Sequence, residues 1–537
     1  MTQENQTPSG TGKLVGVMLV TAAITAGIAA LLTNINERKE EGRSPFLKLV
    51  DVDENTVDAK TWGTNWPKEY DGYLRTSTPT HTKYGGGVSG GESDPPSQKA
   101  KAFPWLTRMF SGYLFGIDYR DRRGHAFMLY DQEHTDRNKP EEAKQSGNCL
   151  HCHASIMPLY RDLGRKALPN DTEARQIEQG LKEVGRLDYW VAHEQLEKLS
   201  PDKKAHPVGC VDCHDPKTME LRVTRPGFIK GIKALKKHEG NDSYEPNRDA
   251  TRQEMRSFVC AQCHVEYYCG KGVTVFFPWN KGLKVEEIEA WYDSDEIKDN
   301  DEEVKSYFKG DRFYDWVHAE TGAKVLKAQH PEFEVWSQGT HSKAGVACAD
   351  CHMPYKREGS MKISEHHIQS PLLMINRSCQ QCHATPESDL KARVESIQDR
   401  HFALLQRAGQ ALVAALDEIK LLRKESDEKS AAAAEAFAKE LCEKDPKASL
   451  EAEKKKKLTA LWAAVFNDPA NPQLKKIADL QRKAQWRLDF VAAENSMGFH
   501  APQELARILG ESIDYSRQAQ LEAMKLRLGR TTRPAEK

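Results

Sequence analysis

The sequence predicts a mainly α-helical protein with little β-structure, and three observations support this fold class. No alternation of apolar and polar residues, the pattern of a half-buried strand, persists between residues 120 and 385. From residue 386 onward, apolar residues instead recur at three- or four-residue spacing over stretches longer than the average globular helix. The third observation is a cysteine motif that occurs five times. It indicates the kind of bound group around which the first part of the chain folds.

The repeated motif is Cys-X-X-Cys-His, at residues 149–153, 210–214, 260–264, 348–352 and 379–383. Two thiols three positions apart can each form a thioether with a haem vinyl group, and the histidine that follows ligates the iron. Zinc sites need no histidine after every cysteine pair, and disulfide frameworks do not repeat this triplet. We therefore expect five covalent haem c groups, held by Cys149, Cys152, Cys210, Cys213, Cys260, Cys263, Cys348, Cys351, Cys379 and Cys382 and ligated by His153, His214, His264, His352 and His383.

The fold expected from these motifs is a multihaem cytochrome c fold, in which short helices and loops wrap the haems and long helices follow. The mean hydropathy of −0.70 is low for a core of 537 residues, and haem macrocycles would supply the missing apolar volume. The net charge of −1 gives no indication of nucleic-acid binding. Because haem is attached to c-type cytochromes outside the cytoplasm, we expect a periplasmic protein.

The N-terminus has a segment suited to a membrane. Residues 14–36 carry no charge and are long enough to span a bilayer core. A cleaved signal peptide is the alternative, because small residues surround Ile28. The apolar run continues to Leu32, which favours an uncleaved anchor in the cytoplasmic membrane. Residues 1–36 are thus expected to be an anchor or uncleaved signal, and residues 37–61 a tether.

The remaining chain divides into a pentahaem region, residues 62–385, and a long-helix region, residues 386–537. No proline interrupts residues 387–445, and the helical pattern returns at 454–466 and 474–495, before Pro502 opens another helix. The apolar seams of these helices either pack on one another or are shared between two subunits. We favour a homodimer interface here, because the haem region offers little regular surface.

Axial ligands decide whether such a protein is an enzyme. Five irons have ten axial positions, and the motif histidines fill five of them. A catalytic haem must leave one side open for substrate. Fourteen histidines lie outside the motifs' ligand positions, so the number of histidines alone does not show how many irons have a second ligand. Taken singly, His125, His341, His366 and His500 are each more typical of surface or capping histidines than of ligands.

At this point the chain resembles a known family. Residues 62–502 are similar to the pentahaem, ammonium-forming cytochrome c nitrite reductases. The resemblance rests on Cys-Ala-Gln-Cys-His-Val-Glu-Tyr-Tyr at 260–268, Lys-Ala-Gln-His-Pro-Glu at 327–332, and Arg-Gly-His-Ala-Phe-Met-Leu-Tyr-Asp at 123–131 with Arg137 six residues further on.

The resemblance implies a function and a site. The function is the dissimilatory, six-electron reduction of nitrite to ammonium at one open haem, fed by four haems with two histidine ligands each. His125, His341, His366 and His500 would be the second ligands, with the last supplied by the long-helix region, and the haem of residues 149–153 would be open. Arg137, Tyr267 and His330 would act on the substrate, and one calcium ion would be bound by Glu266, Gln329 and the carbonyls of Tyr267 and Lys327.

The chain departs from the family at one position. The best-known members have lysine as the proximal ligand of the first haem, whereas this chain has His153. Two alternative functions remain: a pentahaem electron carrier with every iron doubly ligated, and a related reductase that acts mainly on hydroxylamine or sulfite. The electron donor is expected to be a membrane quinol dehydrogenase or a small cytochrome.

Overall fold

The structure, a computed structural model, describes residues 10–41, 48–78, 80–85, 98–120, 123–139, 145–270, 273–294, 312–359, 361–445 and 448–531. It divides into two compact units, Met1–Asp51 and Val52–Lys537. The first contains α1 (Gly10–Glu41), within which Gly12–Glu37 is long and apolar enough to cross a membrane and is not buried. A signal sequence has the same properties, so the helix is compatible with both expectations for this segment.

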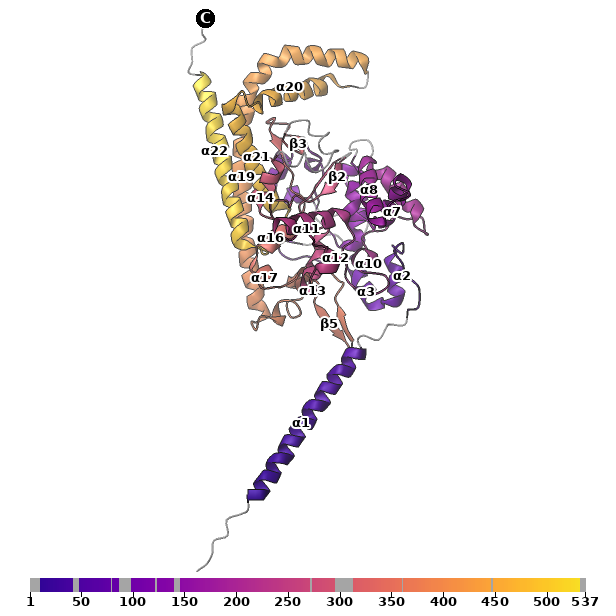
Figure 1. Cartoon of the computed structure of the whole chain (residues 1–537). Helices are drawn as coiled ribbons and strands as arrows, with labels where there is room; N and C mark the ends of the chain where they lie inside the picture. The colour runs from indigo at the N-terminus through magenta and orange to yellow at the C-terminus, as the bar shows by residue number, and fades with distance from the viewer. Residues whose placement is uncertain are drawn as a thin grey trace, which may run out of the picture. The chain divides into compact units, whose positions relative to one another are not determined.

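The second unit is built of helices with little β-structure, as predicted, and the structure as a whole is 63% helical (Figure 1). Its described strands form three antiparallel pairs: β1 (Tyr268–Gly270) with β2 (Val273–Phe276), β3 (Trp316–Val317) with β4 (Lys324–Val325), and β5 (Tyr355–Glu358) with β6 (Met361–Ser364). The helices before residue 386 are short: α2 (Ala59–Asn65), α3 (Pro67–Arg75), α4 (Trp105–Met109), α5 (Met128–Glu133), α6 (Leu150–His153), α7 (Met157–Ala167), α8 (Glu173–Arg186), α9 (Tyr189–Leu199), α10 (Cys210–Cys213), α11 (Pro226–His238), α12 (Pro246–Asp249), α13 (Arg252–Ala261), α14 (Val285–Tyr292), α16 (Glu332–Ser337), α17 (Thr340–Lys343) and α18 (Cys348–His352).

One apolar core supports the first and third motifs. Leu150, Ala261 and Val265, which belong to or follow motifs, are buried in it. Helices α7 and α8 reach it side by side, and their backbones approach very closely. A Cβ atom at Gly164 would lie 1.7 Å from the carbonyl oxygen of Gln176, so only glycine permits this contact.

The C-terminal region consists of α19 (Glu387–Lys444), α20 (Leu450–Phe466), α21 (Pro472–Ala493) and α22 (Pro502–Thr531), which confirms the expected long helices. Helix α22 packs along α19 and α21, and α20 folds back on α19 (Figure 1). Helix α20 begins four residues before the apolar pattern predicts. Its N-cap, Ser449, accepts the N–H of Ala452, and the charged residues that follow extend the helix without an apolar stripe.

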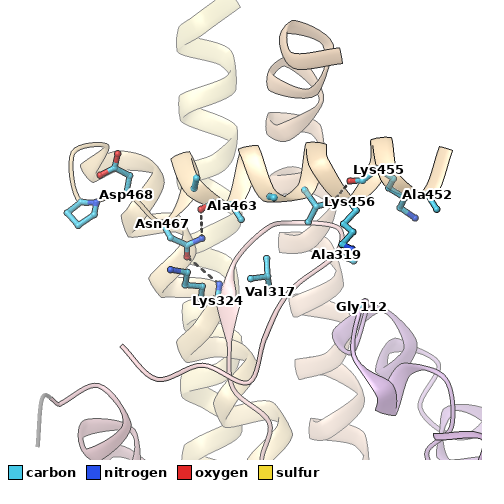
Figure 2. Close-up of a pocket in the computed structure, with 14 residues that line it drawn as sticks. Gly112, Val317, Ala319, Lys324, Ala452, Lys455, Lys456, Ala463, Asn467 and Asp468 are labelled. Carbon is cyan, nitrogen blue, oxygen red and sulfur yellow. Dashed lines mark hydrogen bonds between the residues drawn. The ribbon is translucent and has the colours of Figure 1, made fainter. Parts of the chain in front are cut away.

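A groove lies between α20 and the β3–β4 pair (Figure 2). Lys455 and Lys456 border it from α20, and Lys324 borders it from β4. No residue predicted for the haem, calcium or substrate sites lines it, so the groove is separate from those sites. Its lining consists of Gly112, Val317, Ala319, Lys324, Ala452, Lys455, Lys456, Thr459, Ala460, Ala463, Ala464, Asn467, Asp468 and Pro469.

Candidate functional site

Three motif histidines each face a second histidine. The ring centroids are 6.2 Å apart for His214 and His366, 6.3 Å for His341 and His383, and 6.4 Å for His352 and His500. A metal–imidazole bond of about 2.0–2.1 Å puts a ring centroid roughly 3 Å from the metal, so two rings on opposite sides of one metal lie about 6 Å apart. The three pairs therefore fit haem irons held from both sides.

Backbone carbonyls orient the rings of these histidines. Nδ1 of His214 donates to the carbonyl oxygen of Met219 at 2.9 Å, and Nδ1 of His352 donates to that of Gln369 at 3.0 Å. His366 is held in the same way by Ser364 at 2.9 Å. A carbonyl oxygen can only accept, so Nδ1 carries the proton and Nε2 keeps the lone pair that a metal requires.

His153 has the same orientation but a different counterpart. Its Nδ1 donates to the carbonyl oxygen of Met128 at 2.9 Å, which leaves Nε2 available to iron. In the described part of the chain, no histidine ring faces His153 at a distance like those of the three pairs. The first motif is thus distinguished from the second, fourth and fifth.

Glycines bring two of the second histidines into place. A Cβ atom at Gly339 would lie 2.0 Å from the carbonyl oxygen of His500, so the segment that carries His341 can pass His500 only without a side chain there. Nδ1 of His500 also lies 2.6 Å from Oε1 of the buried Glu494. Gly124, which precedes His125, is also closely approached. A Cβ atom at this position would lie 2.3 Å from Cβ of Thr76. The role of His125 as a second haem ligand stays a prediction.

The third motif is in contact with three others. The sulfur atoms of Cys263 and Cys152 are within hydrogen-bonding distance, and so are those of Cys260 and Cys348. Cys213 also lies close enough to Cys263 for an electrostatic interaction. Because thioether bonds lie at the haem edge, haems on these cysteines would meet edge to edge.

The fifth motif joins this series through the fourth. Cys351 lies close enough to Cys379 and Cys382 for electrostatic interaction. The five motifs therefore lie as neighbours in one series, with the third motif between the first, second and fourth.

Arg137, predicted to hold the substrate, lies next to the first motif. Its guanidinium interacts electrostatically with Cys149 and with His153. Cζ of Arg137 is 4.0 Å from the centroid of the Phe115 ring. Its Nε is buried, and none of the described residues accepts a hydrogen bond from it. A buried donor without a partner is costly in a native fold, which suits a group whose partner is a ligand.

Tyr267 and His330 approach this region on two adjacent segments. The amide of His330 donates to the carbonyl oxygen of Val265 at 3.2 Å, which aligns the segment 327–332 with the residues after the third motif. Tyr267 packs against the same core cluster as Cys149. The structure therefore brings all three residues predicted to act on substrate to the side of the fold shared by the first and third motifs.

Three carboxylates, of which those of Glu266 and Asp489 are buried and that of Asp315 is half-buried, hold the segment that precedes His330. The amide of Lys327 donates to Asp315 at 2.7 Å, that of Ala328 to Asp489 at 2.8 Å, and that of Gln329 to Glu266 at 2.6 Å. Charge-assisted hydrogen bonds are about twice as strong as neutral ones, so three consecutive bonds fix this backbone firmly.

The residues predicted to bind calcium fit a hard cation. Glu266 has no exposed surface, and it accepts the hydroxyl of Tyr292 at 3.0 Å. Burial, and to a lesser extent the nearby Glu334, raises the pKa of Glu266 well above its usual range, and burial raises that of Glu334 to about 8. A carboxylate in such surroundings needs a cation to carry its charge.

The chemistry of this donor set indicates which cation fits. Among the described residues no three His, Cys, Asp or Glu side chains gather as a metal site. One carboxylate, the Gln329 amide and two backbone carbonyls are all oxygen donors, which calcium prefers and transition metals do not.

The sequence did not reveal several residues that position the site. The carbonyls of Met128, Met219 and Gln369 have no side-chain signal at all. Asp489 and Glu494 lie in the last turns of α21, where acidic residues are ordinary on a helix surface; only their burial shows that they face the site.

Together these features define a multihaem c-type cytochrome. The sequence profile of the cytochrome c552 family matches residues 58–535, so the chain belongs to that family.

Relatives in this family match most of the chain. Cytochrome c-552 of Bacteroides fragilis is 33% identical over 512 residues, 94% of this chain and 84% of the relative. The cytochrome c nitrite reductase subunit NrfA of Nitratidesulfovibrio vulgaris is 31% identical over 517 residues, 94% of this chain and 83% of the relative.

A solved structure has the same fold. It is the catalytic subunit NrfA of cytochrome c nitrite reductase from Desulfovibrio desulfuricans, described for the relevance of its two calcium sites. It superimposes with a TM-score of 0.66 and 26% identity over 89% of this chain and 88% of that chain. The similarity therefore extends over the haem region and the long helices together.

Proposed function

We propose that the protein reduces nitrite to ammonium at the haem of the first motif, with electrons supplied through the other four. The observation that carries this proposal is the pairing of histidines. Three motif histidines face a second imidazole, whereas His153 has beside it the buried guanidinium of Arg137. A buried guanidinium whose Nε has no partner among the described residues, beside an iron ligand that faces no second histidine among them, suits an enzyme that binds an anion.

The reaction requires six electrons and eight protons for each nitrite, and it yields one ammonium ion and two water molecules. A haem held by Cys149, Cys152 and His153 would supply the electrons. The residues of this chain bind the anion, exclude water and deliver protons. Similar proteins support this substrate, because two of them are nitrite reductases.

Arg137 and Lys327 provide positive charge for the substrate. Nζ of Lys327 lies 4.8 Å from the centroid of the Phe115 ring, which Arg137 also contacts, so two cations flank one aromatic ring. Arg137 presents forked donors that match the two oxygens of nitrite. A calcium ion at Glu266 would add to this positive potential and hold Tyr267 and the segment of His330 in place.

His330 and Tyr267 are the proposed proton donors. Imidazole exchanges protons near neutral pH, and a phenol can donate a hydrogen bond to oxygen or to a late, nearly neutral intermediate. Both residues lie on segments fixed by the carboxylates of Glu266, Asp315 and Asp489. This rigid support keeps the donors at a constant distance from the substrate.

The test is turnover by the purified holoprotein with a chemically reduced viologen dye, nitrite, and direct detection of ammonium. Stoichiometric ammonium with no accumulation of hydroxylamine is expected. Turnover of hydroxylamine or sulfite without nitrite would favour the related-reductase alternative. No turnover of any of these, with all haems reducible, would favour the electron carrier.

The proposed cofactors are five haem c groups and one calcium ion. Haem is counted by the pyridine haemochrome absorbance per protein, and calcium by elemental analysis after dialysis. Five haems and one tightly held calcium are expected. A second calcium equivalent that survives dialysis would show that the calcium count is wrong.

We also propose a periplasmic location, with residues 1–36 as membrane anchor and 37–61 as tether. The donor would then be a membrane quinol dehydrogenase or a small cytochrome. Cell fractionation with an antibody to the C-terminus tests the location, and N-terminal sequencing of the mature protein distinguishes an anchor from a cleaved signal.

A further inference from the structure

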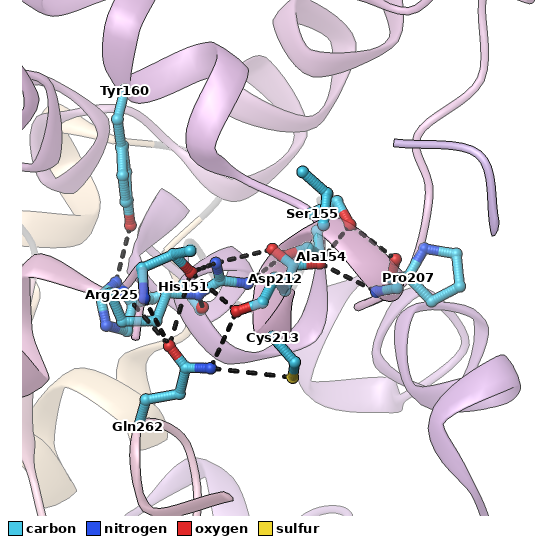
Figure 3. Close-up of polar contacts among 12 residues, drawn as sticks. His151, Ala154, Ser155, Tyr160, Pro207, Asp212, Cys213, Arg225 and Gln262 are labelled. Atoms are coloured by element: carbon cyan, nitrogen blue, oxygen red, sulfur yellow. Dashed lines mark hydrogen bonds and ion pairs between the residues drawn. The ribbon is translucent and has the colours of Figure 1, made fainter. Parts of the chain in front are cut away.

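The residue before the second cysteine differs among the first three motifs, yet all three of these residues meet at Arg225, at the start of α11. They are His151 and Asp212, which contact its side chain, and Gln262, which contacts its backbone amide (Figure 3). Arg225 has no exposed surface. It belongs to none of the predicted sites.

Arg225 uses four of its five N–H groups on partners from this region. Nε donates to the carbonyl oxygen of His151 at 2.6 Å, and Nη2 donates to that of Ala154 at 2.9 Å. Nη1 donates to Oδ1 of Asp212 at 2.7 Å and to the hydroxyl of Thr224 at 3.0 Å. The side chain thus joins the backbone of the first motif to the side chain of the second.

Gln262 extends the same connection to the third motif. Its Oε1 accepts the backbone amides of Thr224, at 3.1 Å, and of Arg225, at 3.3 Å. Its Nε2 donates to the carbonyl oxygen of Asp212 at 3.0 Å. Figure 3 shows Arg225, Asp212 and Gln262 converging between the backbone segments of the motifs.

The charged groups of this cluster are buried, as its hydrogen bonds are. Asp212 is 1% exposed, and its second oxygen accepts the hydroxyl of Ser155 and the amide of Gly209. Arg225 interacts electrostatically with Cys263, and Cys213 interacts with Arg225. A fixed positive and a fixed negative charge therefore lie beside the haem-binding cysteines with little water to screen them.

We propose that Arg225 is a positioning residue that fixes the first three haems relative to one another and, with Asp212, sets their reduction potentials. Electron transfer weakens steeply with distance between haem edges, so a rigid junction keeps the path into the first haem constant. Net charge and hydrogen bonding near a haem are also main controls of its potential. The inference rests on haem attachment at these motifs and not on nitrite as the substrate.

The chain contains a matched control. In the fourth motif the equivalent position is Asp350, and Nη2 of Arg256 donates to its Oδ1 at 2.6 Å. Arg256 also donates to the hydroxyl of Tyr355, and it is similarly buried. It contacts one motif instead of three. A change at Arg256 should therefore alter one haem, and a change at Arg225 should alter three.

The experiment measures the reduction potential of each haem in the holoprotein by a redox titration followed by visible absorption and electron paramagnetic resonance. Asp212→Asn leaves the positive charge uncompensated, so the potentials of the haems on the first three motifs should rise. Arg225→Met leaves the negative charge, so they should fall. A solely structural role predicts no such opposition of sign. Arg256→Lys should leave the three potentials unchanged.

Arg225→Lys provides a variant that keeps the charge if Arg225→Met does not take up haem. Because lysine keeps the positive charge, the reduction potentials should change little. Lysine cannot, however, donate to two carbonyls and Asp212 together. The rate at which the first haem is reduced after rapid mixing with dithionite should therefore fall about tenfold, as is typical when an outer-shell partner is lost. Potentials that move in the same direction in Asp212→Asn and Arg225→Met, or an unchanged reduction rate in Arg225→Lys, would overturn the proposal. Ammonium formation is not part of the readout, so the outcome does not depend on the proposed function.

Discussion

Arg137 lies against Phe115, with Cζ 4.0 Å from the ring centroid, and this contact holds a buried cation beside the first haem motif. The aromatic face replaces part of the hydration that the guanidinium loses. The orientation leaves Nε without a partner among the described residues. A ligand with two oxygen atoms would accept the hydrogen bond from this Nε.

The first prediction concerns this guanidinium. Arg137→Lys keeps the charge but loses the fork, so kcat/KM for nitrite should fall about 100-fold, the loss typical of removing one donor from a preorganised anion site. Haem content should be unchanged. Arg108→Lys is the control, because Arg108 forms an ion pair with Glu320 away from the motifs and should leave turnover as it is.

The second prediction tests the calcium site. Glu266→Gln keeps an acceptor for the Gln329 amide but removes the negative charge, so calcium affinity should fall about 10- to 100-fold and turnover should fall with it. Glu334→Gln is the control, because Glu334 accepts the Glu266 amide and the Trp279 indole without being a proposed ligand. Equal calcium loss in both variants would contradict the assignment of Glu266.

The third prediction concerns His153. Both imidazole and amine bind iron as neutral donors, and the substrate side is formed by other segments. His153→Lys should therefore retain nitrite reduction within about two orders of magnitude while the potential of the first haem shifts, because the bond to Met128 is lost. Wild-type protein that carries five haems but reduces only hydroxylamine would refute the proposed catalytic role of this haem.

The fourth prediction is a dependence of stability on pH through His318. This side chain is buried, and its Nδ1 accepts the amides of Glu320 and Thr321 while Nε2 donates to the carbonyl oxygen of Arg108. Burial lowers the pKa of His318 to about 4. The folded protein therefore binds this proton less readily than the unfolded chain, whose histidine titrates near pH 6.5.

The contribution of His318 to the free energy of unfolding is fully present above pH 6.5. It is lost as the pH falls from 6.5 to about 4, by about 3 kcal/mol in total. His318→Gln lacks this titration, although it is less stable at neutral pH. Urea unfolding followed at pH 7 and pH 4.5 should show that the wild type loses more stability between the two than the variant. Parallel losses would show that His318 titrates normally in the folded state.

The fifth prediction concerns the proposed homodimer. Helices α19 and α22 expose Leu421, Leu521 and Leu528, which are 47%, 54% and 52% exposed. If these helices form the interface, Leu521→Glu should convert the dimer to a monomer in analytical ultracentrifugation, with absorption spectra unchanged. Leu49→Glu, a change at another exposed leucine far from these helices in sequence, should leave the dimer intact.

Much of the fold could be predicted from the sequence because its signals are local. A cysteine motif occupies five residues, and a proline such as Pro502 indicates a helix start within one turn. The fold class and the long C-terminal helices were confirmed for this reason. The assigned roles of the site residues came from resemblance and stay predictions.

The remaining parts of the site could not be predicted because they depend on contacts between distant segments. Arg225 resembles any other arginine before a helix until folding places two carbonyls and Asp212 around it. Asp489 likewise acts on Ala328 across 161 positions of sequence. No periodicity or motif encodes such pairs.

The histidine pairs also determine when each haem site can be completed as the chain emerges during export. His341 precedes His383, so in the proposed ligation both ligands of the fifth haem are present once its own motif appears. His500 follows His352 by 148 residues, so in the proposed ligation the fourth haem keeps a single histidine ligand until α19, α20 and α21 have emerged. A chain truncated between α21 and His500 would thus carry all five haems and still hold a second reactive iron, a hazard that full-length synthesis removes.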